Sequence, residues 1–411
     1  MENKKYKICV LPSDRTGVSK FRSVDPHTYL QKMYPDEFWV DIIYDPPYQD
    51  DDFWKQFDLV HYHRSVGPNH ELAKMVQRKL TKWGIPHIMD LDDYWLPTSD
   101  HPAYMMIKTS NLHKHIMDNL RLAGHVTTTT PHFVKEIKKF NDNVSIYPNG
   151  IDHEEKQYVP KPTVSDKVRV GWLGGSSHIK DLEILSGVFG RLHNERADSL
   201  QTVLCGYDLR GTMTEMDKVT GEQKQRAILP MESVWYKYEQ IFTNNHGNLP
   251  EEYKKELLEF KKKPITGDLD STYRRVWTKP ITTYAANYNY FDVSLAPLKE
   301  HIFNKVKSQL KVIESGFHKK ALIAQDFGPY QIDCVNLFER GGKLNPKGNS
   351  LLVDTNKNHK LWYKYTKYLI DNPNAVTDLG EKLYETVYPK YSLKKITETR
   401  AEFYRELIKK S

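Results

Sequence analysis

Short apolar runs alternate with helical stretches along the first part of the chain, and this alternation constrains the fold more than any other feature of the sequence. The helical stretches include 71–83 and 131–140. Strands that alternate with helices form a parallel sheet, because each helix carries the chain back to the start of the next strand. Residues 1–155 are therefore predicted to form one Rossmann-like, doubly wound α/β domain. Its predicted strands are 6–11, 57–63, 86–90, 125–130 and 144–147.

A turn and a polar linker interrupt the pattern, which restarts after them. Pro148, Asn149 and Gly150 are typical of a turn, and 153–166 is polar and carries two prolines. A chain of 411 residues also exceeds what one hydrophobic core usually organises. We predict a second Rossmann-like parallel-sheet domain at 167–388 and expect the two domains to face each other across a cleft. The second set of predicted strands is 167–173, 201–204, 291–295, 321–324 and 350–353.

Two segments fall outside this frame. Residues 208–283 are far longer than an ordinary connection in such a fold and look mostly helical and charged, so we interpret them as an insertion in the second domain. Their aromatic stretches, 230–236 and 273–277, are expected to pack the insertion on its domain, with the lining of an acceptor site as the alternative. Residues 389–411 are predicted to form a C-terminal helix, and its return to the first domain is left open.

Composition and the apolar runs indicate which classes of protein the chain can belong to. No apolar run approaches the roughly 18 to 20 residues of a membrane span, and the first residues do not resemble a signal peptide. The three cysteines are far apart and form no zinc or disulfide pattern, so they are expected to be buried thiols in a reducing compartment. The net charge of +7 is dispersed and suits an anionic ligand or membrane surface, or no partner at all. We expect a cytoplasmic protein and leave association with the inner face of the membrane open.

The loops at the carboxyl ends of the strands are where open α/β sheets bind ligands, because helix N-termini there offer free amides to phosphate. Loop 12–22 carries one glycine and three cations. Loop 171–181 carries adjacent glycines that allow close approach of a ligand, and then a histidine and a lysine that could neutralise a diphosphate. Neither loop fits GxGxxG or GxxxxGK[ST], which disfavours a NAD enzyme or a P-loop NTPase, and a plain turn is the alternative for each.

The segment 303–330 is the most informative part of the sequence. On a helix, Lys307, Lys311 and Glu314 are spaced i, i+4, i+7 and share one face, while apolar side chains form another. The helix follows the predicted strand at 291–295, so its start is expected at the carboxyl edge of the sheet, where ligands bind. A solvated face of salt bridges is the alternative interpretation.

Four motifs occur in a specific order and spacing. They are YPNGID (147–152), VGWLGG (170–175), FDVSLAPL (291–298) and KSQLKVIE (307–314). Together they resemble the GT-B glycosyltransferases of family four, and the resemblance covers nearly the whole chain apart from the insertion. It implies the GT-B fold, and the transfer of a sugar from a nucleotide-diphosphate sugar to a glycan or lipid-linked acceptor, with retention of configuration and without a metal or other cofactor.

The resemblance also implies roles for individual residues. Glu314 would hold the ribose hydroxyls of the nucleotide, because a carboxylate can accept two O–H bonds at once. Lys311 and Lys180 would balance the charge of the departing diphosphate. The sequence departs from the family at Val306, where many members carry a second glutamate, and at Trp172, where an arginine is often found. The remaining predicted donor-binding residues are Gly17, Arg22, Gly174, Gly175, His178, Phe303, Asn304, Lys307 and Ser308.

Acceptor binding is predicted in the first domain, after the strand 86–90. Asp92 and Asp93 follow that strand and are the candidates for contact with the acceptor. With Asp90 they could instead hold a divalent cation, which the resemblance argues against. His101 is predicted to orient the acceptor hydroxyl or take its proton, and a surface histidine is the alternative.

The sequence therefore predicts a glycosyltransferase of polysaccharide or glycoconjugate synthesis. Its expected partners are a nucleotide sugar and a glycan or lipid-linked acceptor, with no nucleic acid and with peripheral membrane contact left open. One alternative is a sugar-nucleotide epimerase or phosphorylase on the same frame, because a fold does not fix a reaction. The other is a non-catalytic protein that binds nucleotide sugars.

Overall fold

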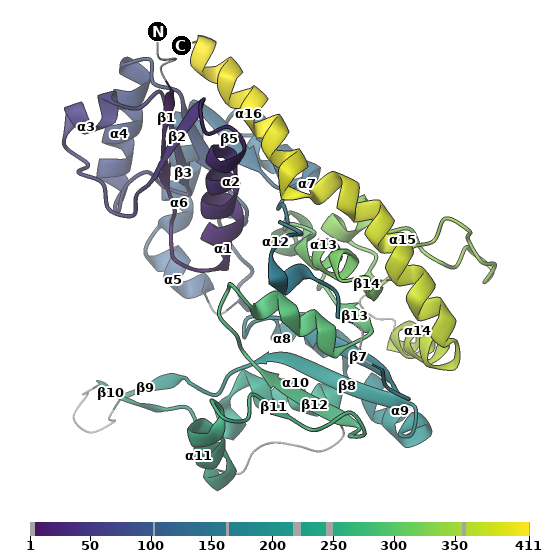
Figure 1. Cartoon of the computed structure of the whole chain (residues 1–411). Helices are drawn as coiled ribbons and strands as arrows, with labels where there is room; N and C mark the ends of the chain where they lie inside the picture. The colour runs from purple at the N-terminus through teal and green to yellow at the C-terminus, as the bar shows by residue number, and fades with distance from the viewer. Residues whose placement is uncertain are drawn as a thin grey trace. The chain divides into compact units, whose positions relative to one another are not determined.

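The structure, a computed structural model, describes residues 5–101, 103–161, 164–216, 223–243, 250–355 and 359–410. It divides into two compact units (Figure 1). Unit 1 comprises residues 1–153, 300–310 and 388–411, and unit 2 comprises residues 154–299 and 311–387. None of the described helices is long and apolar enough to cross a membrane.

Unit 1 is built on a six-stranded sheet in which every neighbouring pair is parallel. The order of the strands is β2-β1-β3-β4-β5-β6. The chain therefore moves outward from β1 to β2 and then jumps to the other side of β1 to form β3. The carboxyl ends of β1 and β3 lie at this switch point. The strands are β1 (Tyr6–Leu11), β2 (Phe38–Ile42), β3 (Leu59–His63), β4 (His87–Asp90), β5 (His125–Thr128) and β6 (Val144–Ile146).

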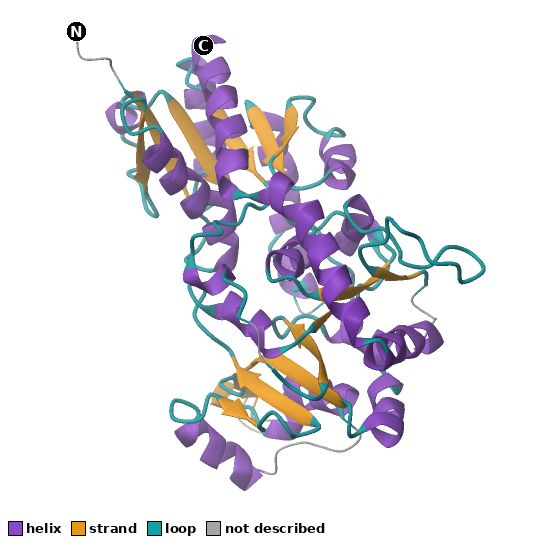
Figure 2. Ribbon diagram, turned by 45° about the vertical axis from the view of Figure 1, so that its right-hand side comes forward, coloured by secondary structure: helices purple, strands orange, loops and turns teal. Residues whose placement is uncertain are grey.

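Helices flank this sheet, as Figure 2 shows. Side-chain caps define where several of them begin: Asn69 accepts the backbone N–H of Leu72 at the start of α4, and Thr130 caps α7, which starts with a proline. A π-helix, Lys20–Val24, leads from α1 into α2. The α-helices are α1 (Gly17–Ser19), α2 (Asp25–Met33), α3 (Asp51–Lys55), α4 (His70–Lys82), α5 (Tyr104–Thr109), α6 (Leu112–Leu122), α7 (Pro131–Ile137), α12 (Ile302–Lys305) and α16 (Leu393–Lys410).

The C-terminal helix α16 contributes to the core of unit 1. Ala401 and Tyr404 are completely buried and share a hydrophobic cluster with Ile8 and Val10 of β1. The hydroxyl of Tyr404 also lies 2.7 Å from Nε2 of the buried His27 on α2. The last residues of the chain thus complete the domain that its first residues begin.

Unit 2 is built on a seven-stranded sheet in the order β11-β12-β8-β7-β13-β14-β15. All neighbouring strands are parallel except β11, which is antiparallel to β12. Here β7 is the first strand; β8 lies on one side of it and β13 on the other, so the switch point lies between β7 and β13. The strands are β7 (Val168–Leu173), β8 (Leu200–Tyr207), β11 (Ile265–Thr266), β12 (Tyr273–Trp277), β13 (Val293–Ala296), β14 (Ala321–Gln325) and β15 (Leu351–Val353).

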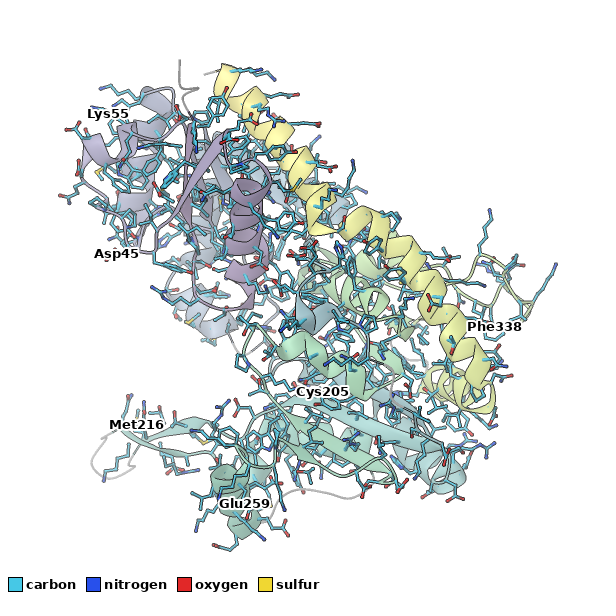
Figure 3. The ribbon with its side chains drawn as sticks, viewed as in Figure 1. Asp45, Lys55, Cys205, Met216, Glu259 and Phe338 are labelled. Atoms are coloured by element: carbon cyan, nitrogen blue, oxygen red, sulfur yellow. The ribbon has the colours of Figure 1, made fainter. Side chains whose placement is uncertain are left out.

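The core of unit 2 is rich in aromatic side chains. Trp172, Trp277 and Trp362 are almost fully buried and belong to one cluster. Cys205 on β8 (Figure 3) is fully buried, and burial raises the pKa of the Cys205 thiol to about 12. Cys9 is also fully buried, and Cys334 is 7% exposed. The helices are α8 (Ile179–Leu182), α9 (Val188–Arg196), α10 (Val234–Phe242), α11 (Pro250–Glu259), α13 (Leu310–Phe317), α14 (His359–Asp371) and α15 (Pro373–Tyr391), with 3-10 helices at Lys156–Tyr158, Glu183–Leu185, Pro230–Glu232, Tyr284–Tyr290 and Gly328–Ile332.

The described part of 208–283 is less helical than the sequence suggested. It forms an antiparallel hairpin of β9 (Thr212–Met216) and β10 (Gln223–Ala227), the helices α10 and α11, and strands β11 and β12 of the central sheet. Strand β12 is hidden in the sequence by two arginines, although the aromatic and β-branched residues around them favour a strand. Arg275 is accommodated by ion pairs with Glu239 and Glu256. The hairpin precedes the two helices and strands β11 and β12 follow them, so the expectation of a mostly helical segment is wrong.

The sequence also misplaced the segment 300–310. We expected it in the second domain, whereas contacts assign it to unit 1. The backbone carbonyl of Val306 accepts a hydrogen bond from Thr130 Oγ1 at 3.2 Å, and Asn149 Nδ2 donates to Ser308 Oγ at 3.1 Å. Four predicted donor-binding residues are therefore part of the first unit: Phe303, Asn304, Lys307 and Ser308.

Candidate functional site

The switch point of unit 2 brings together the loops that follow β7 and β13. Asp181, just after the β7 loop, accepts the backbone N–H of Lys299 after β13, with a distance of 2.8 Å to its Oδ1. Its Oδ2 lies 2.8 Å from Nδ1 of His178. Asp181 therefore ties the two loops together and fixes the ring of His178.

The glycine turn after β7 is held by a tyrosine. Tyr238 on α10 donates its hydroxyl to the carbonyl of Gly175 at 3.2 Å, and its oxygen accepts the backbone N–H of His178 at 3.0 Å. A β-carbon at Gly174 would lie 2.3 Å from the ring of Trp172, so only glycine fits there without a shift. Nothing lies within 4 Å of such an atom at Gly175, whose surroundings are open. At this turn the space beside Gly174 is filled by Trp172, whereas the space beside Gly175 is empty.

Helix α13 places its lysine at the end of β7. The Nζ atom of Lys311 donates to the carbonyl of Leu173, the last residue of that strand, and lies 5.1 Å from the ring centroid of Trp172. The ammonium is thus held at the carboxyl edge of the sheet by a carbonyl and an aromatic face. The tryptophan that stands where an arginine was expected is part of this arrangement.

Glu314, one turn further along α13, is 4% exposed. One of its carboxylate oxygens accepts the hydroxyl of Tyr284 and the other accepts that of Tyr288, the latter at 3.1 Å. Burial raises the pKa of Glu314 to about 6, although Tyr284, Lys311 and Tyr288 each favour its charged form. Each oxygen retains a second lone pair, so the tyrosines orient the carboxylate without exhausting its capacity to accept.

Lys180 is turned toward a neighbour on its own helical stretch. Its Nζ lies 2.9 Å from Glu183, and both side chains are 46% exposed. An exposed pair of this kind contributes little to stability, so Lys180 can exchange its partner for a ligand at small cost.

In unit 1, Arg22 is buried and structural. Its guanidinium makes a two-pronged contact with Asp90, with Nε at 2.8 Å and Nη2 at 2.7 Å, and Nη1 donates to the carbonyl of Tyr147 and to Asn149 Oδ1. Arg22 is 1% exposed. Arg22 therefore joins the π-helix to the end of β4 and to the segment after β6, and its contact with the donor stays a prediction. Gly17 starts α1 in the same loop.

Asp92 and Asp93 are both held by cations. Arg64 Nη2 lies 3.2 Å from Asp92 and 2.9 Å from Asp93, and Nε2 of His63 lies 2.9 Å from Asp92. Partial burial and the charge of Asp92 raise the pKa of Asp93, while Arg64 and Lys307 oppose this. The carboxylates that we considered for a cation are thus paired with protein cations. Among the described residues no group of three or more His, Cys, Asp or Glu could hold a metal ion.

His101 packs against the segment 300–310. Its ring lies 5.3 Å from that of Phe303, and its Nδ1 accepts the backbone N–H of Ala103 at 3.1 Å. Phe303 also carries the ammonium of Lys307, 4.8 Å from its ring centroid. In the same segment, the backbone N–H of Asn304 donates to His301 Nδ1 at 3.3 Å. His101, Phe303 and Lys307 thus form one local group.

The sequence did not indicate several residues of these sites. The tyrosines beside Glu314 come from a 3-10 helix that gave no periodic signal. Ser13 and His63, which are hydrogen bonded to each other at 2.7 Å, come from the ends of β1 and β3. The predicted strands already placed both at the carboxyl edge, so the position of strand ends was the signal that could have found them.

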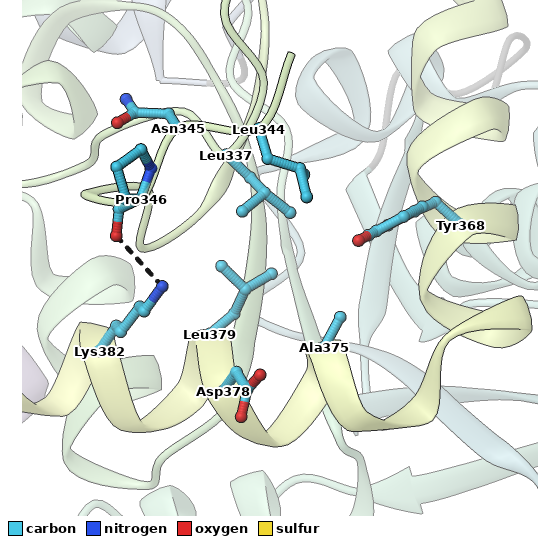
Figure 4. Close-up of a pocket in the computed structure, with 9 residues that line it drawn as sticks. All are labelled: Leu337, Leu344, Asn345, Pro346, Tyr368, Ala375, Asp378, Leu379 and Lys382. Atoms are coloured by element: carbon cyan, nitrogen blue, oxygen red, sulfur yellow. Dashed lines mark hydrogen bonds between the residues drawn. The ribbon is translucent and has the colours of Figure 1, made fainter. Parts of the chain in front are cut away.

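A cavity of about 360 Å³ in unit 2 shares no residue with these sites (Figure 4). Leu337, Leu344 and Leu379 form its apolar side, and Lys382 Nζ donates to the carbonyl of Pro346 at 3.3 Å at its edge.

Comparisons with known proteins agree with this architecture. No protein-family model and no curated protein matches the sequence. Among solved structures, the sucrose-phosphate synthase of Thermosynechococcus elongatus matches with a TM-score of 0.58 at 14% identity, over 99% of this chain and 100% of that one. HepE from Anabaena, in complex with UDP, matches with a TM-score of 0.57 at 12% sequence identity, over 97% of this chain and 100% of HepE. A glycosyltransferase from Rickettsia africae matches with a TM-score of 0.56 at 15% sequence identity, over 99% of this chain and 100% of that one.

These likenesses extend over nearly the whole chain and concern the fold. Both units have the parallel, doubly wound sheets that the sequence predicted. The fold prediction is confirmed: the protein has the GT-B fold of glycosyltransferases.

Proposed function

We propose that this protein is a glycosyltransferase that moves a sugar from a nucleotide-diphosphate donor to a glycan or lipid-linked acceptor in polysaccharide or glycoconjugate synthesis. The fold is that of glycosyltransferases, and a solved structure with the same fold, HepE from Anabaena, holds UDP and in another crystal UDP-glucose. Retention of configuration is part of the proposal on the strength of the sequence motifs. No metal or other cofactor takes part in it.

One observation carries the proposal. At the switch point of unit 2, Lys311 lies at the end of β7, next to the turn of Gly174 and Gly175. Ligands of open α/β sheets bind at this position. An ammonium at this position suits a diphosphate, whose charge grows as the bond to the sugar breaks. Lys311 and the glycine turn would therefore bind the leaving group, with His178 and Lys180 at its margin.

Glu314 is proposed to accept the ribose hydroxyls. Tyr284 and Tyr288 hold its carboxylate in one orientation, and each oxygen keeps one lone pair for a further donor. A hydrogen bond to an ionised acceptor is roughly twice as strong as one between neutral groups. Donor affinity should therefore depend on the ionised form of this side chain.

Donor turnover tests the proposal directly. The purified protein is incubated with a panel of nucleotide sugars, with and without lipid and glycan extracts, and release of nucleoside diphosphate is measured together with the product. Release that requires an extract supports transfer, whereas conversion of the donor without any acceptor points to an epimerase. Binding without turnover of any donor, with or without extract, would leave a non-catalytic nucleotide-sugar-binding protein.

Matched variants test the site. Lys311→Met should raise the donor dissociation constant by about tenfold or more, because a charge-assisted contact contributes about 1.5–3 kcal/mol. Calorimetry measures this constant. Lys367→Met is the control, since Lys367 is paired with Asp371 on α14, away from the strand ends. Equal donor affinity in both variants would rule out the assignment of Lys311.

A lipid-linked acceptor would bring the protein to a membrane surface, and the net charge of +7 supports contact with anionic lipids. Co-sedimentation with vesicles tests this part separately. Binding to phosphatidylglycerol vesicles that falls with salt supports it, and equal binding to neutral and anionic vesicles refutes it.

A further inference from the structure

A second cavity of unit 2, of about 320 Å³, lies between helix α11 and the strands β11 and β12. Its volume is at the lower end of the range for sites that bind small molecules. Trp277 and Phe260 form its apolar wall, and their ring centroids are 5.0 Å apart. Trp277 belongs to the aromatic stretch 273–277, for which the sequence left both packing and ligand binding open. It packs in the core of unit 2 and also borders this cavity.

Arg275 is held in place at the floor of the cavity. It is buried and pairs with Glu239 at 3.1 Å and with Glu256, and its guanidinium donates to the hydroxyl of Tyr207 at 3.0 Å. These contacts order Arg275 before any ligand arrives, so binding there would cost little side-chain freedom. This part of the cavity is therefore preorganised.

The charges around the cavity balance. Three carboxylates and three cations line it: Glu252, Glu256, Glu259, Lys255, Lys263 and Arg275. Equal numbers of both signs give no attraction for a phosphate or another ion. So many charged groups also disfavour an acyl chain, because an apolar ligand would strip them of water without replacing its hydrogen bonds. A neutral ligand that both donates and accepts hydrogen bonds fits this lining best.

A sugar residue has these properties. Each of its hydroxyls can donate to a carboxylate and accept from a cation. The C–H groups on the face of its ring can pack against an aromatic side chain, which supplies a large apolar surface. The cavity offers an aromatic wall together with acceptors and donors, so it meets both parts of a sugar.

The cavity lies along the same edge of the sheet as the proposed donor site. Strands β12, β8 and β7 are neighbours and parallel, so their carboxyl ends share one edge. Two strand spacings separate the end of β12 from the end of β7 by about 10 Å. Helix α10 joins the two places, because Tyr238 holds the turn at Gly175 and the next residue, Glu239, pairs with Arg275.

We infer that this cavity binds a neutral sugar residue of a glycan, and the choice of a glycan over another polyol rests on the proposed transferase function. The face of the sugar would pack against Phe260. Its hydroxyls would donate to Glu259 and accept from Lys263. Binding there makes and breaks no covalent bond, and it would hold a glycan on unit 2 close to the donor site.

Saturation-transfer difference NMR tests the site on the full chain without donor. The probes are maltose, cellobiose and lactose, with glucose 6-phosphate as a charged comparison. At least one neutral disaccharide should receive saturation from the protein, and titration gives its dissociation constant. Saturating UDP should not displace it, because UDP would occupy the ends of β7 and β13.

Variants place the bound sugar. Thr266 is an exposed residue of β11 that lines the cavity, and aromatic residues favour strands, so Thr266→Trp should fold and fill part of the space. It should raise the dissociation constant of the disaccharide at least tenfold. Glu259→Ala (Figure 3) removes a charged acceptor and should raise it about tenfold. Glu251→Ala is the control, since Glu251 lies on the same helix, is exposed and pairs with Lys254 outside the cavity.

Unfolding in guanidinium chloride should show the same midpoint for the wild type, Glu259→Ala and Glu251→Ala. If Thr266→Trp lowers the midpoint, the comparison of Glu259→Ala with Glu251→Ala decides the assignment. These two substitutions are matched in chemistry and lie on one helix, so a difference between them reports the cavity.

Several results would overturn the inference. These are no binding of any neutral disaccharide, equal affinity in Glu259→Ala and Glu251→Ala, displacement of the sugar by UDP, or a preference for glucose 6-phosphate. None of these measurements requires turnover of a donor. The transferase function therefore stands or fails separately, by the release of nucleoside diphosphate.

Discussion

The buried carboxyl group of Glu314 should make the stability of unit 2 depend on pH. Burial raises its pKa from the ordinary 4.5 to about 6. At about 1.36 kcal/mol for each pKa unit, this difference corresponds to about 2 kcal/mol. Below pH 4.5 both the folded and the unfolded states hold the proton, and the contribution is fully present. Between 4.5 and 6 only the folded state holds it, so stability falls as pH rises, and the contribution is lost above pH 6.

Glu314→Gln removes this dependence, because an amide does not titrate and can still hydrogen bond to both tyrosines. Guanidinium chloride unfolding is measured for the wild type and the variant between pH 4 and 8, without donor. The variant should gain about 2 kcal/mol relative to the wild type from the acid to the neutral end. Other titrating groups, such as Glu239 with a pKa raised to about 7 by burial, cancel in this difference.

Glu381→Gln serves as the control. Glu381 forms an exposed pair with Lys319, so its difference from the wild type should stay flat across the same range. A flat difference for Glu314→Gln would refute the reasoning, because the carboxyl group would then be no harder to ionise in the folded state. A difference that grows toward acid pH would show that the ionised form is favoured by the fold.

Three further predictions follow from close contacts. Asp90→Asn leaves the buried guanidinium of Arg22 without its carboxylate and should cost about 3–5 kcal/mol in denaturant unfolding, while Asp36→Asn, at an exposed side chain, should not. Gly171→Ala would place a β-carbon 2.3 Å from a phenylalanine ring carbon and should cost about 1–3 kcal/mol, whereas Gly175→Ala meets nothing within 4 Å and should change stability little. The buried thiol of Cys205 should react with a maleimide at pH 8 only after unfolding.

Much of the fold could be predicted because its signals are local. Alternating strands and helices in two sets, separated by a polar linker, predict two doubly wound sheets without knowledge of any contact. The failures occurred where local signals were masked. In β12 two arginines hid a central strand, because their charges are compensated by Glu239 and Glu256, residues distant in the sequence. A single sequence does not display such pairings.

The candidate sites were harder to predict, because they depend on which residues meet. The position of Lys311 follows from its helix and the preceding strand. The tyrosines that hold Glu314 and the carboxylate of Asp90 that pairs with the buried Arg22 could not be inferred from spacing, since each contact joins separate elements. The assignment of 300–310 to unit 1 likewise rests on contacts with Asn149 and Thr130 that periodicity does not encode.

The division of the chain has a consequence for its synthesis. The backbone passes from one unit to the other at 153/154, 299/300, 310/311 and 387/388. A ribosome makes the sheet of unit 1 before unit 2, but the core of unit 1 also needs Ala401 and Tyr404, which are made after all of unit 2. Unit 2 can condense in the meantime. A premature stop before residue 388 would therefore remove part of the core of unit 1, although most of unit 1 is made before unit 2. The exposed core of unit 1 should make the truncated protein a substrate for chaperones and proteases.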